Sequence, residues 1–320
     1  MKKLFAIMLA LMLVLTMGSA LAQEVTEPTP KYVENGETFA IGKTYKTTND
    51  GITPPAEDLE LSVAPQGGAP ALESVAYDAD SKKFTVDLPM YTNVGEYIYV
   101  ITEVDNKQGG VTYDTNTYYL KVTVAYKDDT YSKLVCYTAL HTGSVDGNKA
   151  DAITNTYEAG SLSISKAVTG NMGDKSKYFE FTVTLTGEEG KTYPQEYTVT
   201  STTSNGNNPT TIELGKPATV YLRDGETFTI ENLPKGMTYK VVEAEAENYT
   251  TTIDGASSTD RTANGEIANA DVTVKYVNDY DNGTIDTGIT TDNLPYIVLM
   301  GIVVLAGVAM IAKRRMAHND

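Results

Sequence analysis

Along most of the chain, apolar residues recur at every second position, which is the period of a β-strand with one buried face. From about Lys31 onward these runs are rich in Thr, Val and Tyr, and Gly, Asn, Asp and Pro interrupt them. The runs 97–103, 117–126 and 131–140 have the length of strands, and a polar turn joins the last two. No long stretch has the apolar period of a helix. The sequence therefore predicts an all-β protein made of Ig-like β-sandwiches.

A short break in the strand pattern divides this β-rich body in two. Residues 158–161 are small and polar, and the strand signal restarts at Leu162. We therefore expect two tandem domains of ordinary size, at 31–157 and 160–280. The polar, Gly-containing segment 281–293 that follows is predicted to be an extended connector.

The two ends of the chain have the pattern of an exported, membrane-anchored protein. Residues 1–22 combine a positive start, an apolar stretch too short to span a bilayer and a small-residue cleavage site, so they predict a cleaved signal peptide. Residues 294–312 are long and apolar enough for a transmembrane helix, and the basic tail 313–320 predicts its cytoplasmic side. The body between them is expected outside the cell.

Composition argues against several classes of function. The net charge is -17 and no basic run lies outside the termini, which argues against nucleic-acid binding. The single cysteine, Cys136, forms no internal disulfide, and its neighbours Leu134 and Thr138 predict a small core residue. Only two histidines are present, so neither a His-based metal site nor a Ser-His-Asp triad is expected. We expect no cofactor.

Each predicted domain has a lysine early, a glutamate in the middle and an asparagine late, all on the apolar side of a strand. Alternate residues of a strand share one face, so the residues two positions away report which side a polar residue occupies. Lys166, for example, follows Leu162 and Ile164 on its face. The trio of the first domain is Lys43, Glu103 and Asn155, and that of the second is Lys166, Glu243 and Asn278.

Buried together, these three residue types can form a covalent bond. An apolar site favours the neutral amine and the protonated acid, because burial disfavours charge. The amine then attacks the asparagine carboxamide, while the acid polarises the carbonyl oxygen and relays protons to the departing ammonia. The product is an amide cross-link between a first and a last strand, formed once in each domain. By analogy with a disulfide, it stabilises the domain by on the order of 4 to 5 kcal/mol.

Each of these residues also has a simpler interpretation. A lone lysine at a strand end usually extends its amine into water, and a lone buried Asn or Glu usually bonds to the backbone or to that lysine. The ordered trio, present in both domains, favours the cross-link. In the first domain Lys46 and Asn148 are alternative partners, although Lys46 lies on the opposite strand face.

Several stretches also resemble the pilin isopeptide-linkage domain family, to which the streptococcal T-antigen major pilins belong. The family's glutamate strand and the strand after it resemble VGEYIYVITEVD and GVTYDTNTYYLKVTV. The start and the glutamate region of its second domain resemble LSISKAVTGNMGDKSKYFEFTVTL and VYLRDGETFTIENLPKGMTYKVVEAEAENY. The resemblance implies Lys43 and Lys166 as bond-forming lysines, Asn155 and Asn278 as acceptors, and Glu103 and Glu243 as catalytic acids.

Pilins of this family are joined end to end by a sortase, which cleaves between Thr and Gly of a C-terminal signal and passes the acyl group to a lysine of the next subunit. By this resemblance the signal contains Ile285, Asp286, Thr287 and Gly288, and the cleavage follows Thr287. Asp286 stands where the family's signal has proline. The segment also has the composition of a turn before a membrane anchor.

The same resemblance implies Lys149 as the lysine that receives the acyl group. It lies in GNKADAITN, shortly before Asn155. Lys133 and Lys127 are alternative acceptors, and a solvated loop lysine is the simpler interpretation of Lys149.

Together these features predict a backbone subunit of a sortase-assembled cell-surface pilus, which is a structural protein and not an enzyme. The expected partners are the sortase, identical pilin subunits, tip or basal pilins, a host-surface ligand and, before sorting, the membrane. An anchored adhesin or basal pilin that does not polymerise is one alternative. A glycan-binding surface protein is another, although the chain has no Trp and its Tyr residues often occupy alternating strand positions.

Overall fold

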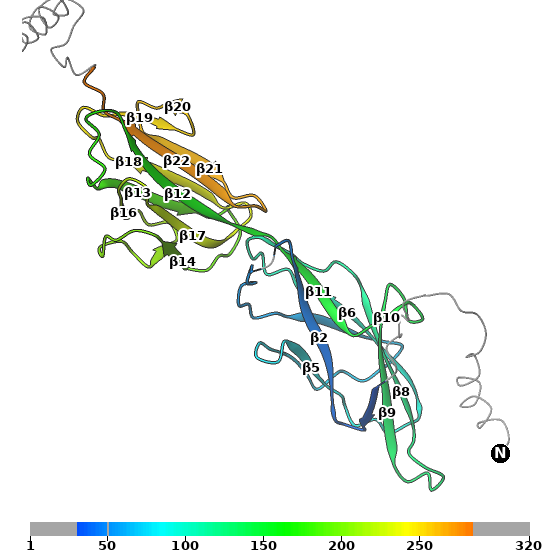
Figure 1. The fold of residues 1–320 in the computed structure, drawn as a ribbon. Helices are drawn as coiled ribbons and strands as arrows, with labels where there is room; N and C mark the ends of the chain where they lie inside the picture. Colours follow the sequence, from blue (N-terminus) through cyan, green and yellow to red (C-terminus); the bar gives the residue numbers. More distant parts are fainter. Residues whose placement is uncertain (1–30, 50, 284–320) are drawn as a thin grey trace, which may run out of the picture. The chain divides into compact units, whose positions relative to one another are not determined.

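The computed structural model describes residues 31–49 and 51–283, and the regular structure in these ranges consists of β-strands (Figure 1). The predicted signal peptide 1–22, the sorting motif around Thr287, the membrane segment 294–312 and the basic tail lie outside the described residues. No helix in the described part is long and apolar enough to cross a membrane. The all-β prediction is confirmed.

The described chain forms two compact units, which we call the N-terminal and C-terminal domains. Their residues are 31–44, 56–104 and 113–155 in the first, and Tyr45–Pro55, Asp105–Thr112 and 156–283 in the second. The first domain predicted from sequence, 31–157, includes residues 45–55 and 105–112. In the structure these two segments belong to the C-terminal domain.

Two sheets enclose the core of the N-terminal domain, in which Phe84, Tyr99 and Leu120 are fully buried. One sheet has the order β1–β9–β8–β6–β3, with β10 paired to β9, and the other has the order β4–β5–β2–β11–β7. The strands are β1 (Lys31–Glu34), β2 (Thr38–Thr47), β3 (Leu61–Gln66), β4 (Ser74–Asp78), β5 (Lys83–Asp87), β6 (Gly95–Glu103), β7 (Val111–Thr112), β8 (Tyr118–Tyr126), β9 (Leu134–Thr142), β10 (Lys149–Ala150) and β11 (Ala152–Tyr157). Of these, β7 and the last residues of β2 and β11 belong to the C-terminal domain.

The C-terminal domain repeats this plan around a core that includes Phe181, Phe228 and Tyr276. Its larger sheet has the order β15–β14–β17–β12–β22–β19–β20, and its smaller sheet has the order β16–β13–β18–β21. The strands are β12 (Ala159–Thr169), β13 (Phe179–Thr186), β14 (Glu196–Ser201), β15 (Thr211–Glu213), β16 (Ala218–Leu222), β17 (Thr227–Pro234), β18 (Thr238–Glu243), β19 (Thr250–Ile253), β20 (Ala256–Ser257), β21 (Thr262–Glu266) and β22 (Val272–Asp279).

The alternation seen in the sequence matches the burial of these strands. In β12 every second side chain from Leu162 to Val168 is buried, and Lys166 falls within that inward set. In β22 the inward set is Val274, Tyr276 and Asn278. The period of two therefore directs lysine and asparagine into the core together with their apolar neighbours.

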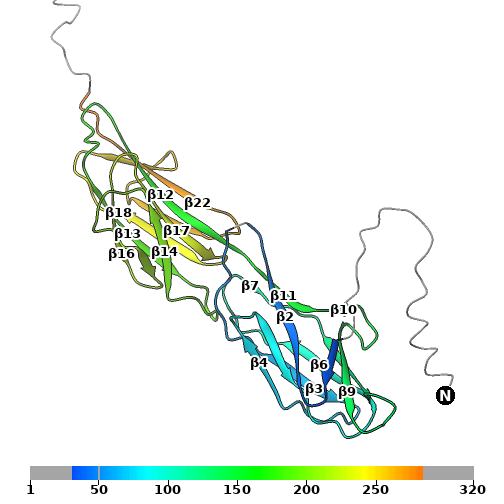
Figure 2. The same cartoon turned by 60° about the horizontal axis from the view of Figure 1, so that its bottom comes forward.

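In each domain the strand that carries the lysine lies next to the strand that carries the asparagine. In the C-terminal domain β12 and β22 are parallel, with Val168 opposite Asn278. In the N-terminal domain β2 lies beside β11, where the hydroxyls of Thr44 and Thr154 are 2.8 Å apart (Figure 2). This pairing places a lysine strand directly next to an asparagine strand in both domains.

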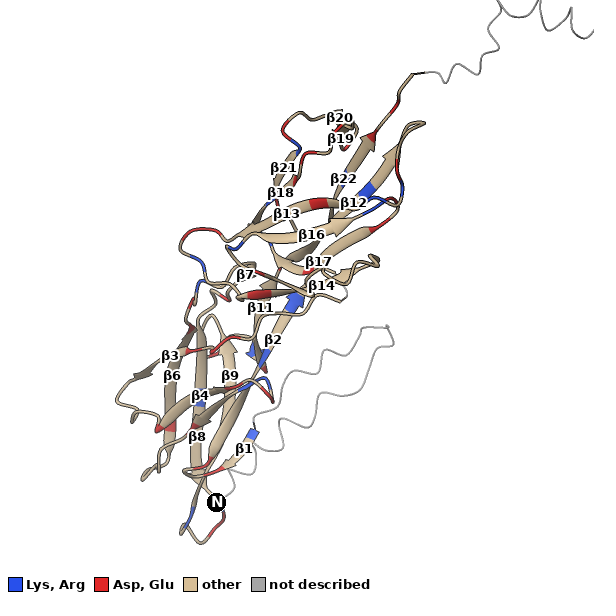
Figure 3. Ribbon diagram, turned by 90° about the vertical axis from the view of Figure 1, so that its left-hand side faces the viewer, with Lys and Arg blue, Asp and Glu red and all other residues tan. Residues whose placement is uncertain are grey.

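Charged side chains are dispersed over both domains. In Figure 3, Asp and Glu occupy strands and loops of each domain, with Lys and Arg interspersed.

Candidate cross-linking sites

In the C-terminal domain, two buried side chains meet at one carboxylate oxygen. Glu243 Oε1 accepts hydrogen bonds from Lys166 Nζ at 2.7 Å and from Asn278 Nδ2 at 2.8 Å. The side chains of Lys166 and Glu243 are 0% exposed. The ring centroids of Phe179 and Phe181 lie 4.3 Å and 5.9 Å from Lys166 Nζ, so the amine lies in an apolar, aromatic environment.

The N-terminal domain has the same arrangement. Glu103 Oε1 accepts hydrogen bonds from Lys43 Nζ at 2.6 Å and from Asn155 Nδ2 at 3.0 Å. The Lys43 side chain is 1% exposed, and the Glu103 side chain and Asn155 are 0% exposed. The structure thus brings together both trios that the sequence singled out.

Opposite sheets supply the members of each trio. Lysine and asparagine come from neighbouring strands of one sheet, β2 and β11 or β12 and β22. The glutamate comes from the other sheet, where Glu103 ends β6 and Glu243 ends β18.

Burial shifts both lysines towards the neutral amine. It lowers the pKa of Lys166 to about 8, although the charge of Glu243 opposes the change. Burial also lowers the pKa of Lys43, against the opposing effects of Glu103, Asp114 and Glu57. A lysine with a lowered pKa is a competent nucleophile near neutral pH.

The carbonyl oxygen of each asparagine has a donor that sequence reasoning did not identify. Asn278 Oδ1 accepts a hydrogen bond from the Thr251 hydroxyl at 2.9 Å. Asn155 Oδ1 accepts one from the Asp114 backbone N–H at 3.0 Å. We expected the glutamate to polarise this oxygen directly, whereas the hydrogen-bonding glutamate oxygen contacts the amide nitrogen.

These two donors leave only weak signals in the sequence. Thr251 is one of several threonines in β19 and is placed against Asn278 by pairing with β22. Asp114 begins a polar break between strands, and its side chain accepts hydrogen bonds from Asn116 N–H and Tyr118 Oη. The break predicts a turn, but the tertiary fold decides where its N–H points.

Comparison with known proteins agrees with this geometry. The Spy0128-like isopeptide containing domain (FctA) matches residues 25–158, and a domain of unknown function (DUF7601) matches residues 160–280. A curated pilin of Streptococcus pyogenes serotype M1 is 30% identical over 237 residues, which cover 70% of this chain and 68% of that pilin. The chain belongs to the Spy0128-like pilin family.

Solved pilins have the same fold. A crystal structure of the major pilin from Streptococcus pyogenes matches with a TM-score of 0.53 and 25% identity, over 77% of this chain and 99% of that chain. The pilus tip adhesin Cpa of Streptococcus pyogenes is 34% identical over 149 residues, which cover 47% of this chain and 20% of that protein. The predicted tandem β-sandwich fold is confirmed, and these relatives are pilins and a pilus tip adhesin.

The alternative cross-linking residues lie elsewhere on this pilin. Lys46 and Asn148 are both exposed, and neither contributes to the cluster around Glu103. Cys136 is 0% exposed, and burial raises the pKa of its thiol to about 11. A buried thiol with a raised pKa is a poor nucleophile, in keeping with its expected place in the core.

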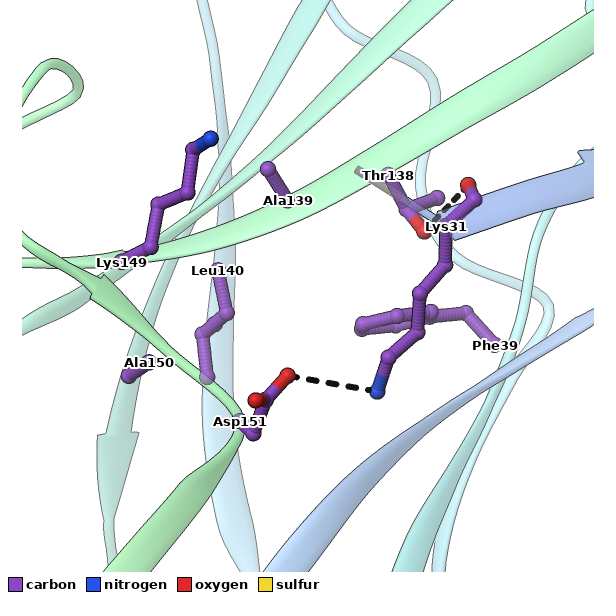
Figure 4. Close-up of a pocket in the computed structure, with 8 residues that line it drawn as sticks. All are labelled: Lys31, Phe39, Thr138, Ala139, Leu140, Lys149, Ala150 and Asp151. Atoms are coloured by element: carbon purple, nitrogen blue, oxygen red, sulfur yellow. Dashed lines mark hydrogen bonds and ion pairs between the residues drawn. The ribbon is translucent and has the colours of Figure 1, made fainter. Parts of the chain in front are cut away.

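The predicted acceptor, Lys149, is half-buried in β10, where it is in register with His141 of β9. Figure 4 shows its side chain passing Ala139, while Lys31 and Asp151 pair with each other at 3.5 Å. Within the described chain, no ion pair is formed by the Lys149 amine.

Of the alternative acceptors, Lys127 forms an ion pair with Glu34 at 2.6 Å, and Lys133 is exposed. Lys149 and Lys133 therefore present freer amines than Lys127. The predicted sorting residues Ile285, Asp286, Thr287 and Gly288 lie outside the described residues.

Proposed function

We propose that this pilin is a backbone subunit of a sortase-assembled pilus on the surface of a Gram-positive bacterium, with each domain locked by a self-formed Lys-Asn amide bond. The observation that carries the cross-link is the shared glutamate oxygen. In each domain one carboxylate oxygen lies within 3.0 Å of both the lysine and the asparagine nitrogens. A proton leaving the attacking amine therefore has a direct route to the departing nitrogen.

A buried ion pair alone is a poorer explanation of this arrangement. Removing two charges from water costs several kcal/mol per ion, so buried pairs seldom stabilise a fold more than apolar packing does. The lysine, glutamate and asparagine have the same relative positions in two separate cores. Amide formation requires the asparagine beside the lysine and the glutamate, whereas an ion pair does not.

The bond would suit a protein that bears tension. It joins β12 to β22, which are adjacent and parallel, so a force along the chain would pass through the amide without unzipping the strands between them. It also closes a loop of roughly a hundred residues, for which disulfides stabilise by about 4 to 5 kcal/mol.

The intact mass of the exported body, residues 23–286, tests the cross-link. We expect a deficit of two ammonia molecules and, after digestion, two linked peptides that join Lys43 to Asn155 and Lys166 to Asn278. A deficit of one would confine the chemistry to one domain. The full unmodified mass would refute self-cross-linking and leave the pilus role to be tested separately.

Polymerisation through Lys149 is the second part of the proposal. The family's assembly by sortase supports it, as do the match to pilins and the position of Lys149 in β10, where its amine forms no ion pair within the described chain. We expect Lys149→Arg to abolish the ladder of high-mass species in cells that express the cognate sortase, while Lys127→Arg leaves it intact. A ladder that persists in Lys149→Arg would exclude Lys149 as the acceptor and favour Lys133.

The match to a pilus tip adhesin favours one second candidate, an anchored adhesin that does not polymerise. Wild-type cells would then show a single anchored species and no ladder. Glycan binding has weaker support. The exposed tyrosines pair edge to face with each other, Tyr32 with Tyr137 and Tyr126 with Tyr131, and the chain has no Trp to form a platform.

A further inference from the structure

Thr251 links the acid and the reacting carbonyl of the C-terminal site. Its hydroxyl oxygen lies 2.9 Å from Asn278 Oδ1 and 3.2 Å from Glu243 Oε2. Thr251 is 4% exposed and is in register with Asn278 on the neighbouring strand. Thus Oε1 of the glutamate faces the two nitrogens, while Oε2 faces the carbonyl through this hydroxyl.

A hydroxyl has a single hydrogen, so Thr251 cannot donate to both oxygens at once. If Glu243 carries its proton on Oε2, the acid donates to the threonine and the threonine donates to Asn278 Oδ1. Both distances then correspond to hydrogen bonds with consistent donors and acceptors. The reaction needs this protonation state, because a neutral amine beside a buried acid is the reactive form.

We propose that Thr251 is a catalytic residue of the cross-linking reaction in the C-terminal domain, where it stabilises the oxyanion and relays the proton of Glu243 to it. This inference rests on the proposed cross-link. The hydroxyl performs the polarisation that the sequence analysis assigned to the glutamate itself.

The proposed step balances in atoms and charge. The lone pair of Lys166 Nζ forms a bond to Asn278 Cγ, and the carbonyl π pair moves to Oδ1, which takes the Thr251 hydrogen. Thr251 regains a hydrogen from Glu243 Oε2, and Glu243 Oε1 accepts a proton from Nζ. The carbonyl re-forms as these hydrogens return along the same path, and the proton on Oε1 passes to Nδ2. The Cγ–Nδ2 bond breaks, ammonia leaves, and the acid is regenerated.

The N-terminal domain offers an internal control. There the Asp114 N–H lies 3.0 Å from Asn155 Oδ1 and 3.3 Å from Glu103 Oε2, in place of the hydroxyl. A backbone N–H stabilises an oxyanion but does not exchange its hydrogen during the step. Loss of the threonine should therefore slow one domain of the molecule and not the other.

The test follows residues 23–286, which contain every described strand, during cell-free synthesis, because the reaction begins when each domain folds. Intact mass and linked-peptide mapping give the reacted fraction of each domain over time. We expect Thr251→Val to slow the C-terminal reaction by about 100-fold, which is the loss typical of one oxyanion donor, and to leave the N-terminal reaction unchanged. Thr251→Ser, which keeps the hydroxyl, should react at close to the wild-type rate.

A C-terminal rate in Thr251→Val equal to that of the wild type would overturn the role of Thr251 while leaving the cross-link intact. A wild type that loses no ammonia would instead refute the cross-link itself. Hydrogen exchange of β18 and β22, compared with unreacted Glu243→Gln, checks that the valine variant folds.

The wild type provides a measurement that does not depend on the folding of a variant. In D2O we expect the C-terminal reaction to slow more than the N-terminal reaction, because two hydrogens move along the Thr251 path in the same step. Equal slowing of the two domains would exclude the relay.

Discussion

The two candidate cross-linking sites of this pilin share a lysine-glutamate-asparagine trio but differ in what surrounds it. In the C-terminal site the lysine faces two phenylalanine rings, and a hydroxyl contacts the asparagine carbonyl. In the N-terminal site the carboxylates of Asp114 and Glu57 also act on the lysine, and a backbone N–H contacts the carbonyl. In the proposed reaction, the trio supplies the reacting groups, while its surroundings influence the charge of the amine and the path of the proton.

The difference predicts that the two domains react at different rates. Burial lowers the pKa of both lysines. At Lys43 the carboxylates of Asp114 and Glu57 act with Glu103 against this shift, whereas at Lys166 Glu243 alone opposes it. We expect the C-terminal domain to complete its cross-link first.

The largest expected effect comes from removing either glutamate. Glu243→Gln keeps the shape of the side chain but removes the acid, so the C-terminal bond should not form, and Glu103→Gln should do the same in the N-terminal domain. Peptide mapping by mass spectrometry should find the other domain fully reacted in each variant. A variant that lacks both bonds would show that the domains are coupled, and one that retains both would remove the glutamates from the mechanism.

Stability gives the next largest effect. Asn278→Ala and Asn155→Ala prevent the bond in their own domains, and the two lysine-asparagine pairs have the same separation in sequence. Each variant should lose about 4 to 5 kcal/mol of unfolding free energy, because the unfolded chain is no longer constrained. Domain-resolved hydrogen exchange in urea measures this loss. The exposed asparagines Asn148 and Asn207 serve as matched alanine controls, and losses no larger than theirs would contradict the prediction.

The pH dependence of stability should separate the two unreacted domains. In Asn278→Ala the folded-state pKa of Lys166 lies below the usual lysine value of 10.5, so the unfolded state binds more protons and stability rises with pH. The free-energy penalty for keeping charged Lys166 in the core is full below about pH 8 and disappears above pH 10.5. Its size is on the order of 3 kcal/mol.

Asn155→Ala should show a smaller rise of stability with pH, because the carboxylates of Asp114 and Glu57 favour charged Lys43. Urea titrations from pH 7 to 11 measure both, and subtracting the cross-linked wild type removes the titration of the tyrosines. A rise of equal size in the two variants would show that the surrounding acids do not distinguish the sites.

The smallest expected effect concerns the turn that presents the Asp114 N–H. Tyr118 Oη donates to Asp114 Oδ2 at 2.6 Å, and one such hydrogen bond contributes about 1 kcal/mol. Tyr118→Phe should therefore slow the N-terminal reaction by about fivefold to tenfold and leave the C-terminal reaction unchanged. Time-resolved intact mass detects this difference. Tyr119→Phe, on the opposite strand face, is the control, and equal slowing by both variants would assign the effect to packing.

Much of the site could be predicted from sequence, because strand periodicity is a local property. Lys166 and Asn278 occupy inward positions in strands that retain their alternation, so two flanking apolar residues were enough to orient each of them. The ordered repetition of three residue types then suggested one chemistry. Local patterning therefore supplied the all-β fold and the three members of each trio.

Other features depended on contacts between strands that are distant in sequence. Whether Glu103 meets the nitrogen or the oxygen of Asn155 depends on how two sheets face each other, and no local pattern specifies that. Likewise, Thr251 reaches Asn278 only because β19 pairs with β22, and it resembles its neighbouring threonines in every local respect. By itself the sequence determined which side chains enter each core, since the period of two is a property of the single strand. The tertiary structure decided which atoms meet there, because contact geometry depends on sheet pairing and packing across the whole domain.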